Sequence, residues 1–254
     1  MMKDTIENLL VRLQSPDVAQ RSSAALQLRP GLGEDDAAMR ALAQVICDDD
    51  DLNVIEDATW ALVRYGGAAL PVLIHALEAA DQQARHNIVH ALGKIGDARA
   101  LPALIAAAGD MTPVVRLKAT YALGQIGDPG AIDALIERLA DPVQNVAWTA
   151  REALGTFAET ALPQLIQSLA VDSVQARELA ANLLGEMSDS RAVEPLIAAL
   201  NTDDWGVRFA IVEALGAIGD ARALPSLQLM IQDAQPQVRA IANASLKLFG
   251  QYGG

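Results

Sequence analysis

One twelve-residue phrase occurs twice in this chain and a third time in a looser form. ALGKIGDARALP begins at Ala91, ALGAIGDARALP begins at Ala214, and ALGQIGDPGAID begins at Ala122. Self-similarity at a fixed period of this size is the signature of a chain built from stacked structural units. The glycine of the ALG triplet marks the period, with steps of 30 or 31 residues, at Gly93, Gly124, Gly155, Gly185 and Gly216.

Extending this period over the chain predicts eight units, each with a short helix followed by a longer one. A single helix pair cannot bury its apolar face, but stacked pairs can. We therefore expect an all-α fold, a right-handed α–α superhelix of about eight helix pairs. We expect this superhelix to be a single domain over residues 1–254, with divergent capping units at 1–66 and regular repeats at 67–250. The units are 4–29, 34–66, 68–96, 99–127, 130–158, 160–188, 191–219 and 222–250.

The repeated phrase has the chemistry of one helix end and the next helix start. In TPVVRLKATYALGQIG, the apolar residues Val115, Ala119 and Leu123 fall on one helical face. Gly127 supplies a residue that tolerates the left-handed conformation at a helix end. Asp128 then suits an N-cap or turn. Prolines in the first turn of the following helix fit this reading, at Pro102, Pro163, Pro195 and Pro225.

Glycines inside the longer helices need a separate explanation. A glycine in a helix interior costs ~1 kcal/mol relative to alanine. We expect Gly93, Gly124 and Gly216 to mark places where neighbouring helices approach too closely for a Cβ atom.

Composition and charge narrow the class of protein. The chain is 52% hydrophobic but 4% aromatic, so its apolar side chains are mostly small and aliphatic, as in closely packed helices. A net charge of −13 repels phosphate backbones and argues against a nucleic-acid partner. MMKDTIENLL has no apolar signal-peptide core, and no apolar run approaches the ~18 residues of a membrane span. With one cysteine, Cys47, we expect a soluble cytoplasmic protein without an internal disulfide.

The consensus DxxxxVRxxAxxALGxIGDxxAxxPLIxAL resembles the HEAT-like repeat of the bilin-lyase type. The resemblance covers nearly the whole chain and is strongest from about 82 to 250. The arginine position of the motif holds Ala19, Ile55 and Ala147 in the first, second and fifth units. The resemblance implies that the other arginines form a structural ladder between turns: Arg85, Arg116, Arg177, Arg208 and Arg239.

The same resemblance implies that the longer helices line a concave binding face. Five of the nine aromatic residues, including all three tryptophans, fall on its predicted positions, as do two of the three histidines. Large aromatics on an otherwise alanine-lined surface are typical of binding hot spots; packing between helices is the alternative. We expect one row of Trp60, His90, Tyr121 and Glu152, and a second of Glu56, His86, Leu117, Trp148, Glu178 and Phe209, with Trp205 at the rim.

Charge along this face is predicted to be uneven. Opposite potentials at two ends would orient a partner, although an ordinary solvated helix surface is an equal alternative. The basic end would comprise Arg21, Arg64, Lys94 and Lys118, and the acidic end Glu152, Glu178, Glu186 and Glu213. The predicted partner-binding residues are Trp60, His86, His90, Tyr121, Trp148, Glu152, Glu178, Trp205, Phe209 and Glu213.

A metal or catalytic site is not expected. His86 and His90 are one helical turn apart, and the resembled family includes deoxyhypusine hydroxylase, whose diiron site has repeated His–Glu pairs. Here Asn87 and Ala91 follow the histidines, and no other unit supplies a second pair. CDDDD, starting at Cys47, lacks the spaced ligands and glycine of a calcium loop. We therefore predict no metal, no cofactor and no catalytic residues.

Three functions stay open at this point. The first is a non-enzymatic scaffold that grips a protein or peptide along its concave face, as repeat solenoids mostly do. The second, from the resemblance, is a bilin lyase or related chromophore-handling factor acting on a phycobiliprotein-like partner. The third is a nucleic-acid protein like some HEAT-like glycosylases, which the acidic charge disfavours. The sequence favours the scaffold.

Overall fold

The computed structural model describes residues 5–33 and 35–252 and divides the chain into two compact units. The first unit is Met1–Asp128 and the second is Pro129–Gly254. Within the described residues both units contain helices, short 3-10 helices and loops, without a strand.

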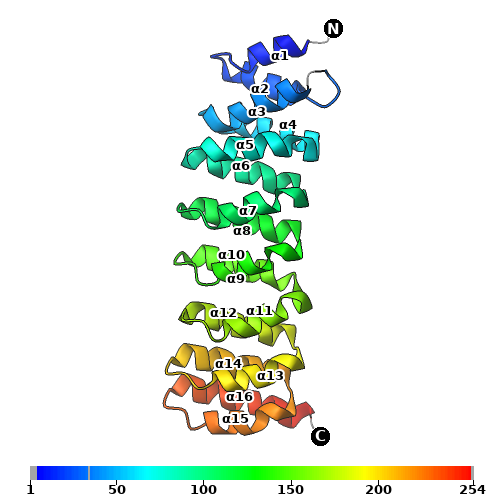
Figure 1. Cartoon of the computed structure of the whole chain (residues 1–254). Coiled ribbons are helices and arrows are strands. Elements are labelled where there is room, and N and C mark those ends of the chain that lie inside the picture. Colours follow the sequence, from blue (N-terminus) through cyan, green and yellow to red (C-terminus); the bar gives the residue numbers. More distant parts are fainter. Residues whose placement is uncertain (1–4, 34, 253–254) are drawn as a thin grey trace. The chain divides into compact units, whose positions relative to one another are not determined.

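In the first unit, successive helices form pairs along the chain, with the second helix longer than the first except in the pair α3 and α4, which both have 14 residues (Figure 1). The long helix α4 packs against α2 and α6, and α6 packs against α8, so that successive pairs share one apolar interior. The elements are α1 (Ile6–Arg12), α2 (Val18–Gln27), α3 (Asp35–Asp48), α4 (Leu52–Tyr65), η1 (Gly66–Ala69), α5 (Leu70–Ala79), α6 (Gln82–Ile95), η2 (Ala98–Ala100), α7 (Leu101–Ala108) and α8 (Pro113–Ile126).

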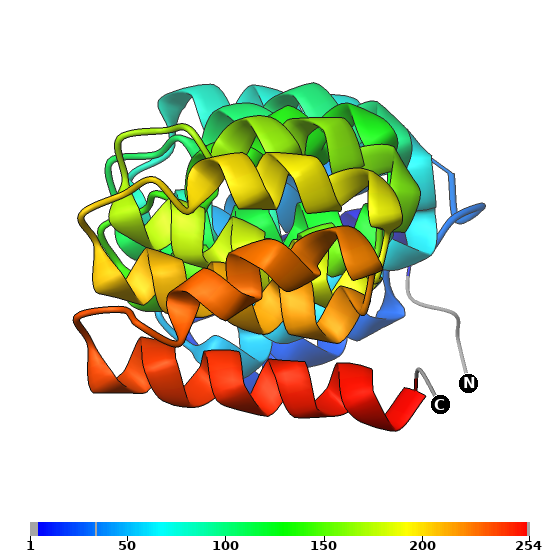
Figure 2. The same cartoon turned by 90° about the horizontal axis from the view of Figure 1, so that it is seen from below.

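The second unit repeats this pairing, and α12 packs against α14, which packs against α16. Figure 2 shows its last pair, α15 in orange beside α16 in red. The elements are η3 (Pro129–Ala131), α9 (Ile132–Arg138), α10 (Gln144–Gly155), η4 (Ala158–Ala161), α11 (Leu162–Ser168), α12 (Val174–Met187), η5 (Ser190–Ala192), α13 (Val193–Ala199), α14 (Trp205–Ile218), η6 (Ala221–Ala223), α15 (Leu224–Met230) and α16 (Pro236–Tyr252). The expected all-α solenoid of stacked helix pairs is confirmed.

The repeated phrase folds as a helix end followed at once by a capped 3-10 turn. Gly96 ends α6 in the left-handed conformation, with φ of 68°. The Asp97 carboxylate accepts a hydrogen bond from the backbone N–H of Arg99 at 2.9 Å, and the Arg99 guanidinium bonds back to the same carboxylate at 2.6 Å. These hydrogen bonds lower the pKa of Asp97 to about 2. The phrase recurs because the same connection, a helix end followed by a capped 3-10 turn, joins the second helix of one repeat to the first helix of the next.

The helix-interior glycines do mark close helix contacts. A Cβ atom on Gly93 would lie 2.7 Å from the Ala122 Cβ, and one on Gly216 would lie 2.6 Å from the Ser245 Cβ. Side-chain carbon atoms do not approach so closely, and the prediction is confirmed at these two positions. For Gly124 it stays a prediction. Gly155 differs, because its nearest neighbour would be a leucine methyl 3.8 Å away.

The arginines of the repeat connect neighbouring repeats, as expected. In α6, the Arg85 Nε lies 2.7 Å from Oδ2 of Asp110, which precedes α8. In α14, the Arg208 Nε lies 2.7 Å from Oδ2 of Asp233, which precedes α16. Each guanidinium also donates to a backbone carbonyl in the loop just before its own helix, Ala80 for Arg85 and Thr202 for Arg208. The ladder role is confirmed for this pair of arginines.

The first unit has a ladder arginine that the sequence alignment misplaced. Arg21 in α2 lies 2.6 Å from Asp49 and donates to the Ser15 carbonyl at 2.9 Å. It stands two residues after Ala19, where the motif places its arginine. The prediction that Arg21 belongs to the basic end of the binding face is therefore wrong, because its guanidinium is held by Asp49 and the Ser15 carbonyl.

One stretch of the described residues, Leu52–Ala79, is long and apolar enough to cross a membrane, with a mean hydropathy of 1.3. It is not one straight helix, because at Gly66 the backbone takes φ of 57° and ψ of −139° and a 3-10 turn leads into α5. The 14 residues of α4 span about 21 Å, short of the ~30 Å of a hydrocarbon core. The stretch comprises two helices of the repeat stack, each packed on its neighbours.

Candidate functional site

The long helices carry exposed aromatic side chains in both units. The exposed fractions are 49% for Trp60, 56% for Tyr121, 44% for Trp148 and 46% for Trp205. Side chains this exposed contribute little to the apolar interior, which consists mainly of alanine, leucine, isoleucine and valine. Phe209 differs: it is half-buried, so the expectation of a largely exposed Phe209 is wrong.

In the first unit, a cluster forms around Trp60 on α4 and α6. We call Glu56, Trp60, His90 and Lys94 the Trp60 cluster. The Lys94 ammonium lies 3.9 Å from the centre of the Trp60 ring and 2.5 Å from Oε1 of Glu56. The His90 Nε2 lies 3.6 Å from the other carboxylate oxygen. The cluster holds one cation between an aromatic face and a carboxylate, an arrangement stabilised by cation–π and ionic attraction.

The cluster shifts the titration of its members. The hydrogen bond from Lys94 lowers the pKa of Glu56. Burial lowers the pKa of His90, and the positive charges of Lys118 and Lys94 lower it further, against the smaller opposing effect of Glu56. His90 is therefore neutral at neutral pH.

The neighbouring residues of α6 do not complete a metal site. His86 is half-buried, and its Nδ1 lies 3.4 Å from Oδ1 of Asn87. Asn87, which follows His86 in the sequence, is buried and donates to the Ile46 carbonyl at 2.9 Å. Over residues 5–33 and 35–252, no group of three or more His, Cys, Asp or Glu side chains is arranged to hold a metal ion.

In the second unit, α10, α12 and α14 enclose an open hollow of about 330 Å³ beside Trp148, which we call the Trp148 hollow. Gly185, Ala214 and Ala217 are its small residues, and Trp148 adds an indole. Its polar lining residues are Arg151, Asn182, Glu186 and Glu213.

The geometry of the hollow follows from close packing of α12 on α14. A Cβ atom on Gly185 would lie 2.7 Å from the Ala214 Cα, so the helices meet almost backbone to backbone. Without large side chains at this contact, the surface above it is recessed. Arg151 lies with its guanidinium carbon 5.4 Å from the Trp148 ring centre and forms an ion pair with Glu186. The hollow therefore combines an aromatic wall, small apolar residues and carboxylates.

The remaining predicted residues of this unit occupy different environments. Glu152 and Glu213 are exposed on α10 and α14. Glu178 is half-buried, and a Cβ atom on Gly206 would lie 2.0 Å from its Oε1, so it packs against the start of α14. Burial, followed by the negative charge of Asp204, raises the pKa of Glu178. Trp148 was expected to adjoin Glu178, yet the hollow joins it to residues about one and two turns further along α12.

The predicted basic end of the surface is largely used by the fold. Besides Arg21, Arg64 donates to the Leu26 and Leu28 carbonyls, each at 2.8 Å, and thereby closes the end of α2. Lys94 is paired with Glu56. The prediction of a basic binding region is therefore wrong for Arg21 and Arg64.

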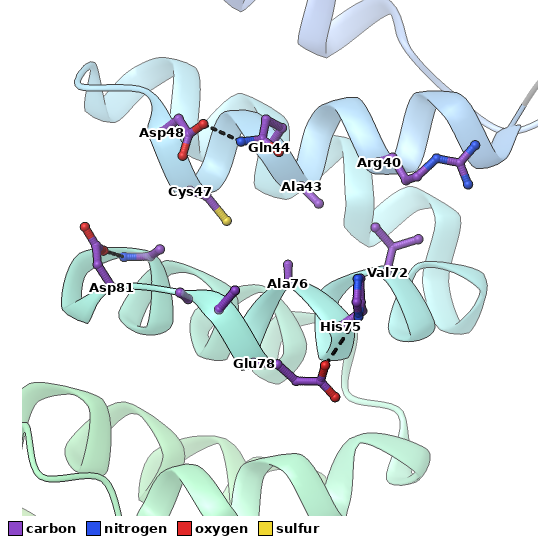
Figure 3. A pocket seen from close by; sticks show the side chains of 13 residues that line it. Arg40, Ala43, Gln44, Cys47, Asp48, Val72, His75, Ala76, Glu78 and Asp81 are labelled. Carbon is purple, nitrogen blue, oxygen red and sulfur yellow. Dashed lines mark hydrogen bonds and ion pairs between the residues drawn. The ribbon is translucent and has the colours of Figure 1, made fainter.

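A second hollow lies between α3 and α5 in the first unit, with a volume of about 570 Å³ (Figure 3). Figure 3 shows Cys47 on α3 facing this space, with His75 and Glu78 on α5. Burial, aided by the nearby Asp48 and Asp81, raises the pKa of the Cys47 thiol to about 11. A thiol that stays protonated at neutral pH is a poor nucleophile. This hollow therefore lacks an activated cysteine.

Sequence reasoning missed Arg151. It occupies the helix position of Thr120 in the preceding repeat, which is buried, so the alignment assigned it no surface role. Its spacing of three residues from Trp148 on one helix was the available signal, because such residues share a helical face. Glu186 was expected on the surface, but the proximity of Asn182 and Glu186 to Trp148 depends on the stagger of α10 and α12.

Several known proteins of solved structure are similar to this chain. No curated protein matches the chain. Among solved structures, human deoxyhypusine hydroxylase is 25% identical with a TM-score of 0.42, over 98% of this chain and 97% of that one. The CpcE–CpcF phycocyanin lyase complex from Nostoc sp. is 24% identical with a TM-score of 0.43, over 98% and 94%.

A larger solenoid gives the higher fold similarity. The karyopherin Kap121p, solved with the extreme C-terminus of the protein phosphatase Cdc14p, has a TM-score of 0.72 at 15% identity. The match covers 97% of this chain and 34% of Kap121p, and it shows the fold alone. Residues 70–155 and 162–247 match the HEAT repeat family, which is more than half of the sequence. The chain belongs to the family of HEAT repeat proteins.

Proposed function

We propose that this protein is a non-enzymatic scaffold that binds a segment of a partner protein on the surface of its long helices. One observation carries the proposal: Trp60 and Trp148 are each about half exposed and each has a cation over its ring. When a partner covers an exposed tryptophan ring, apolar surface is removed from water, which is favourable. Such residues are the usual anchors of protein interfaces.

The family supports the same proposal. Repeat solenoids present extended surfaces and mostly act by binding. The Kap121p structure holds a segment of another protein, which is consistent with this use of the fold. The protonated Cys47 and the lack of a metal-binding group over the described residues give no support to a catalytic role.

The experiment is a selection of random peptides about twelve residues long on the full chain, followed by affinity measurements with variants. We expect Trp60→Ala or Trp148→Ala to weaken binding of a selected peptide by roughly 30-fold. The control is Leu229→Ala, which removes an even more exposed apolar side chain from the short helix α15. The long-helix surface is not the binding site if all three variants weaken peptide binding equally, or if no variant changes the affinity. An absorption change on adding a linear tetrapyrrole would instead favour the chromophore-handling function.

A further inference from the structure

We propose that the Trp148 hollow receives a lysine or arginine side chain, and that the partner segment is therefore a basic peptide. This inference rests on the proposed function and names the chemistry of its partner. It depends on three observations: the carboxylates of the hollow, its apolar lining, and the Trp60 cluster, in which a lysine of the chain itself lies over a tryptophan ring and reaches a carboxylate.

The carboxylates around the hollow outnumber the cations. Glu186 and Glu213 line it, and Glu152 is exposed one turn along α10 from Trp148. Arg151 is the cation of the lining, and it is already paired with Glu186. Within the described residues, no lysine, arginine or histidine lies within ion-pair distance of Glu213. A carboxylate of this kind at the edge of a recess attracts a partner's positive charge.

The apolar lining suits the stem of a long basic side chain. Lysine and arginine have several methylene groups below the charged head, and these prefer apolar contacts. Gly185, Ala214 and Ala217 leave space for such a stem, and Trp148 offers an aromatic surface to it. A short acidic side chain would gain little from this lining and would be repelled by Glu186 and Glu213.

The Trp60 cluster shows the same chemistry completed within the chain. There, Lys94 lies over the Trp60 ring and its ammonium reaches Glu56. In the second unit, Arg151 lies near the Trp148 ring and forms an ion pair with Glu186. Glu213 therefore has no cation of the described chain as its partner. We assign Glu213 as the carboxylate that anchors the incoming basic side chain. Asn182, whose amide both donates and accepts, is placed to bond the peptide backbone.

The test uses the random-peptide selection on the full chain and compares Glu213→Gln with Glu137→Gln. Both variants remove one exposed carboxylate, but Glu137 lies on the short helix α9, away from the hollow's lining. We expect every enriched peptide to carry lysine or arginine and a net positive charge. Glu213→Gln should weaken its binding roughly fivefold to tenfold, and Glu137→Gln by less than about twofold. A tenfold increase in salt should also weaken binding, because exposed charges are screened.

The outcomes separate this inference from the proposed function. If enriched peptides are neutral or acidic, or if Glu213→Gln binds them as tightly as the unaltered chain, the basic-peptide inference is wrong. In that case a loss of affinity in Trp148→Ala would still support the proposed function. If neither Trp148→Ala nor Trp60→Ala weakens binding, both the inference and the proposed function are contradicted. Thermal unfolding of each variant checks that the change at an exposed glutamate leaves the fold intact.

Discussion

The ammonium group of Lys94 lies 3.9 Å above the centre of the Trp60 ring and 2.5 Å from a carboxylate oxygen of Glu56. Lys94 belongs to α6, whereas Trp60 and Glu56 belong to α4, so the contact joins two successive long helices through polar side chains at their exposed surface. It also brings His90 within 3.6 Å of Glu56. This arrangement makes the Trp60 cluster sensitive to pH and charge.

His90 should titrate below the ordinary histidine pKa of about 6.5. Because the folded pKa is lowered, the contribution of His90 to stability is present above about pH 6.5 and is lost as the pH falls through the folded value. Replacing Lys118 by glutamine removes a nearby positive charge and should raise the pKa of His90. Histidine NMR titration measures this shift, with Lys247→Gln in the other compact unit as the control. An unchanged pKa in Lys118→Gln would contradict the electrostatic account.

Gly185→Ala should destabilise the chain even though alanine favours helices. The added Cβ would lie 2.7 Å from the Ala214 Cα, and backbone atoms cannot move aside as a flexible side chain can. We expect a loss of roughly 1–3 kcal/mol in the free energy of unfolding, measured by denaturant titration. Gly155→Ala is the matched control: its Cβ would meet only a methyl at 3.8 Å, so stability should be unchanged or slightly raised. Equal losses in both variants would mean that close packing is not the cause.

Ser188→Gly should stabilise the second unit. Ser188 ends α12 with φ of 52°, the left-handed conformation that glycine adopts at the ends of α6, α8 and α14. The left-handed conformation costs a residue with a Cβ atom about 1 kcal/mol, so glycine should raise the free energy of unfolding by up to that amount. The Ser188 hydroxyl bonds to the Gly185 carbonyl at 3.2 Å and offsets part of the gain. A lower unfolding midpoint in Ser188→Gly would contradict this reading.

Asp233→Asn should lower the free energy of unfolding at neutral pH and make that free energy depend less on pH in the acid range. The hydrogen bond from Arg208 lowers the pKa of Asp233. Its contribution is therefore present above the ordinary aspartate pKa of about 4 and is lost as the pH falls through the lower folded value. Loss of the ion pair should cost roughly 2 kcal/mol, between values for exposed and buried pairs. Denaturant titrations at several pH values measure both effects. If the stability of the variant falls with acid as steeply as that of the unaltered chain, the account of Asp233 is contradicted.

Much of the fold could be predicted from the sequence, because the interactions that define each repeat are local and recur along the chain. The glycine and aspartate of each IGDA corner act through backbone conformation and neighbouring N–H groups, so a repeat of 30 or 31 residues predicts both helices and their boundaries. The close contacts of Gly93 and Gly216 were also predictable, since glycine has no favourable reason to recur inside a helix.

The candidate site was less predictable because it depends on how neighbouring helices are staggered. The sequence placed Trp60, Tyr121, Trp148 and Trp205 on the surface, where they lie. The spacing on α10 could have placed Arg151 beside Trp148, but the sequence could not pair Arg151 with Glu186, because that contact crosses from α10 to α12. It also could not show that Asn87 turns inward to Ile46, since a polar residue beside two histidines reads as exposed.

The most direct measurement is ¹⁹F NMR of the full chain labelled with fluorotryptophan and titrated with a peptide selected on it. A Trp148→Phe variant assigns the Trp148 resonance, and unfolding of Trp148→Ala checks that this exposed ring is not needed for folding. If partners bind on the long-helix surface, the Trp148 resonance shifts in a saturable way with the same affinity as the bound peptide, and Trp148→Ala keeps its melting temperature. A saturated peptide complex with an unmoved Trp148 resonance, or a Trp148→Ala chain that mainly unfolds, would contradict the account.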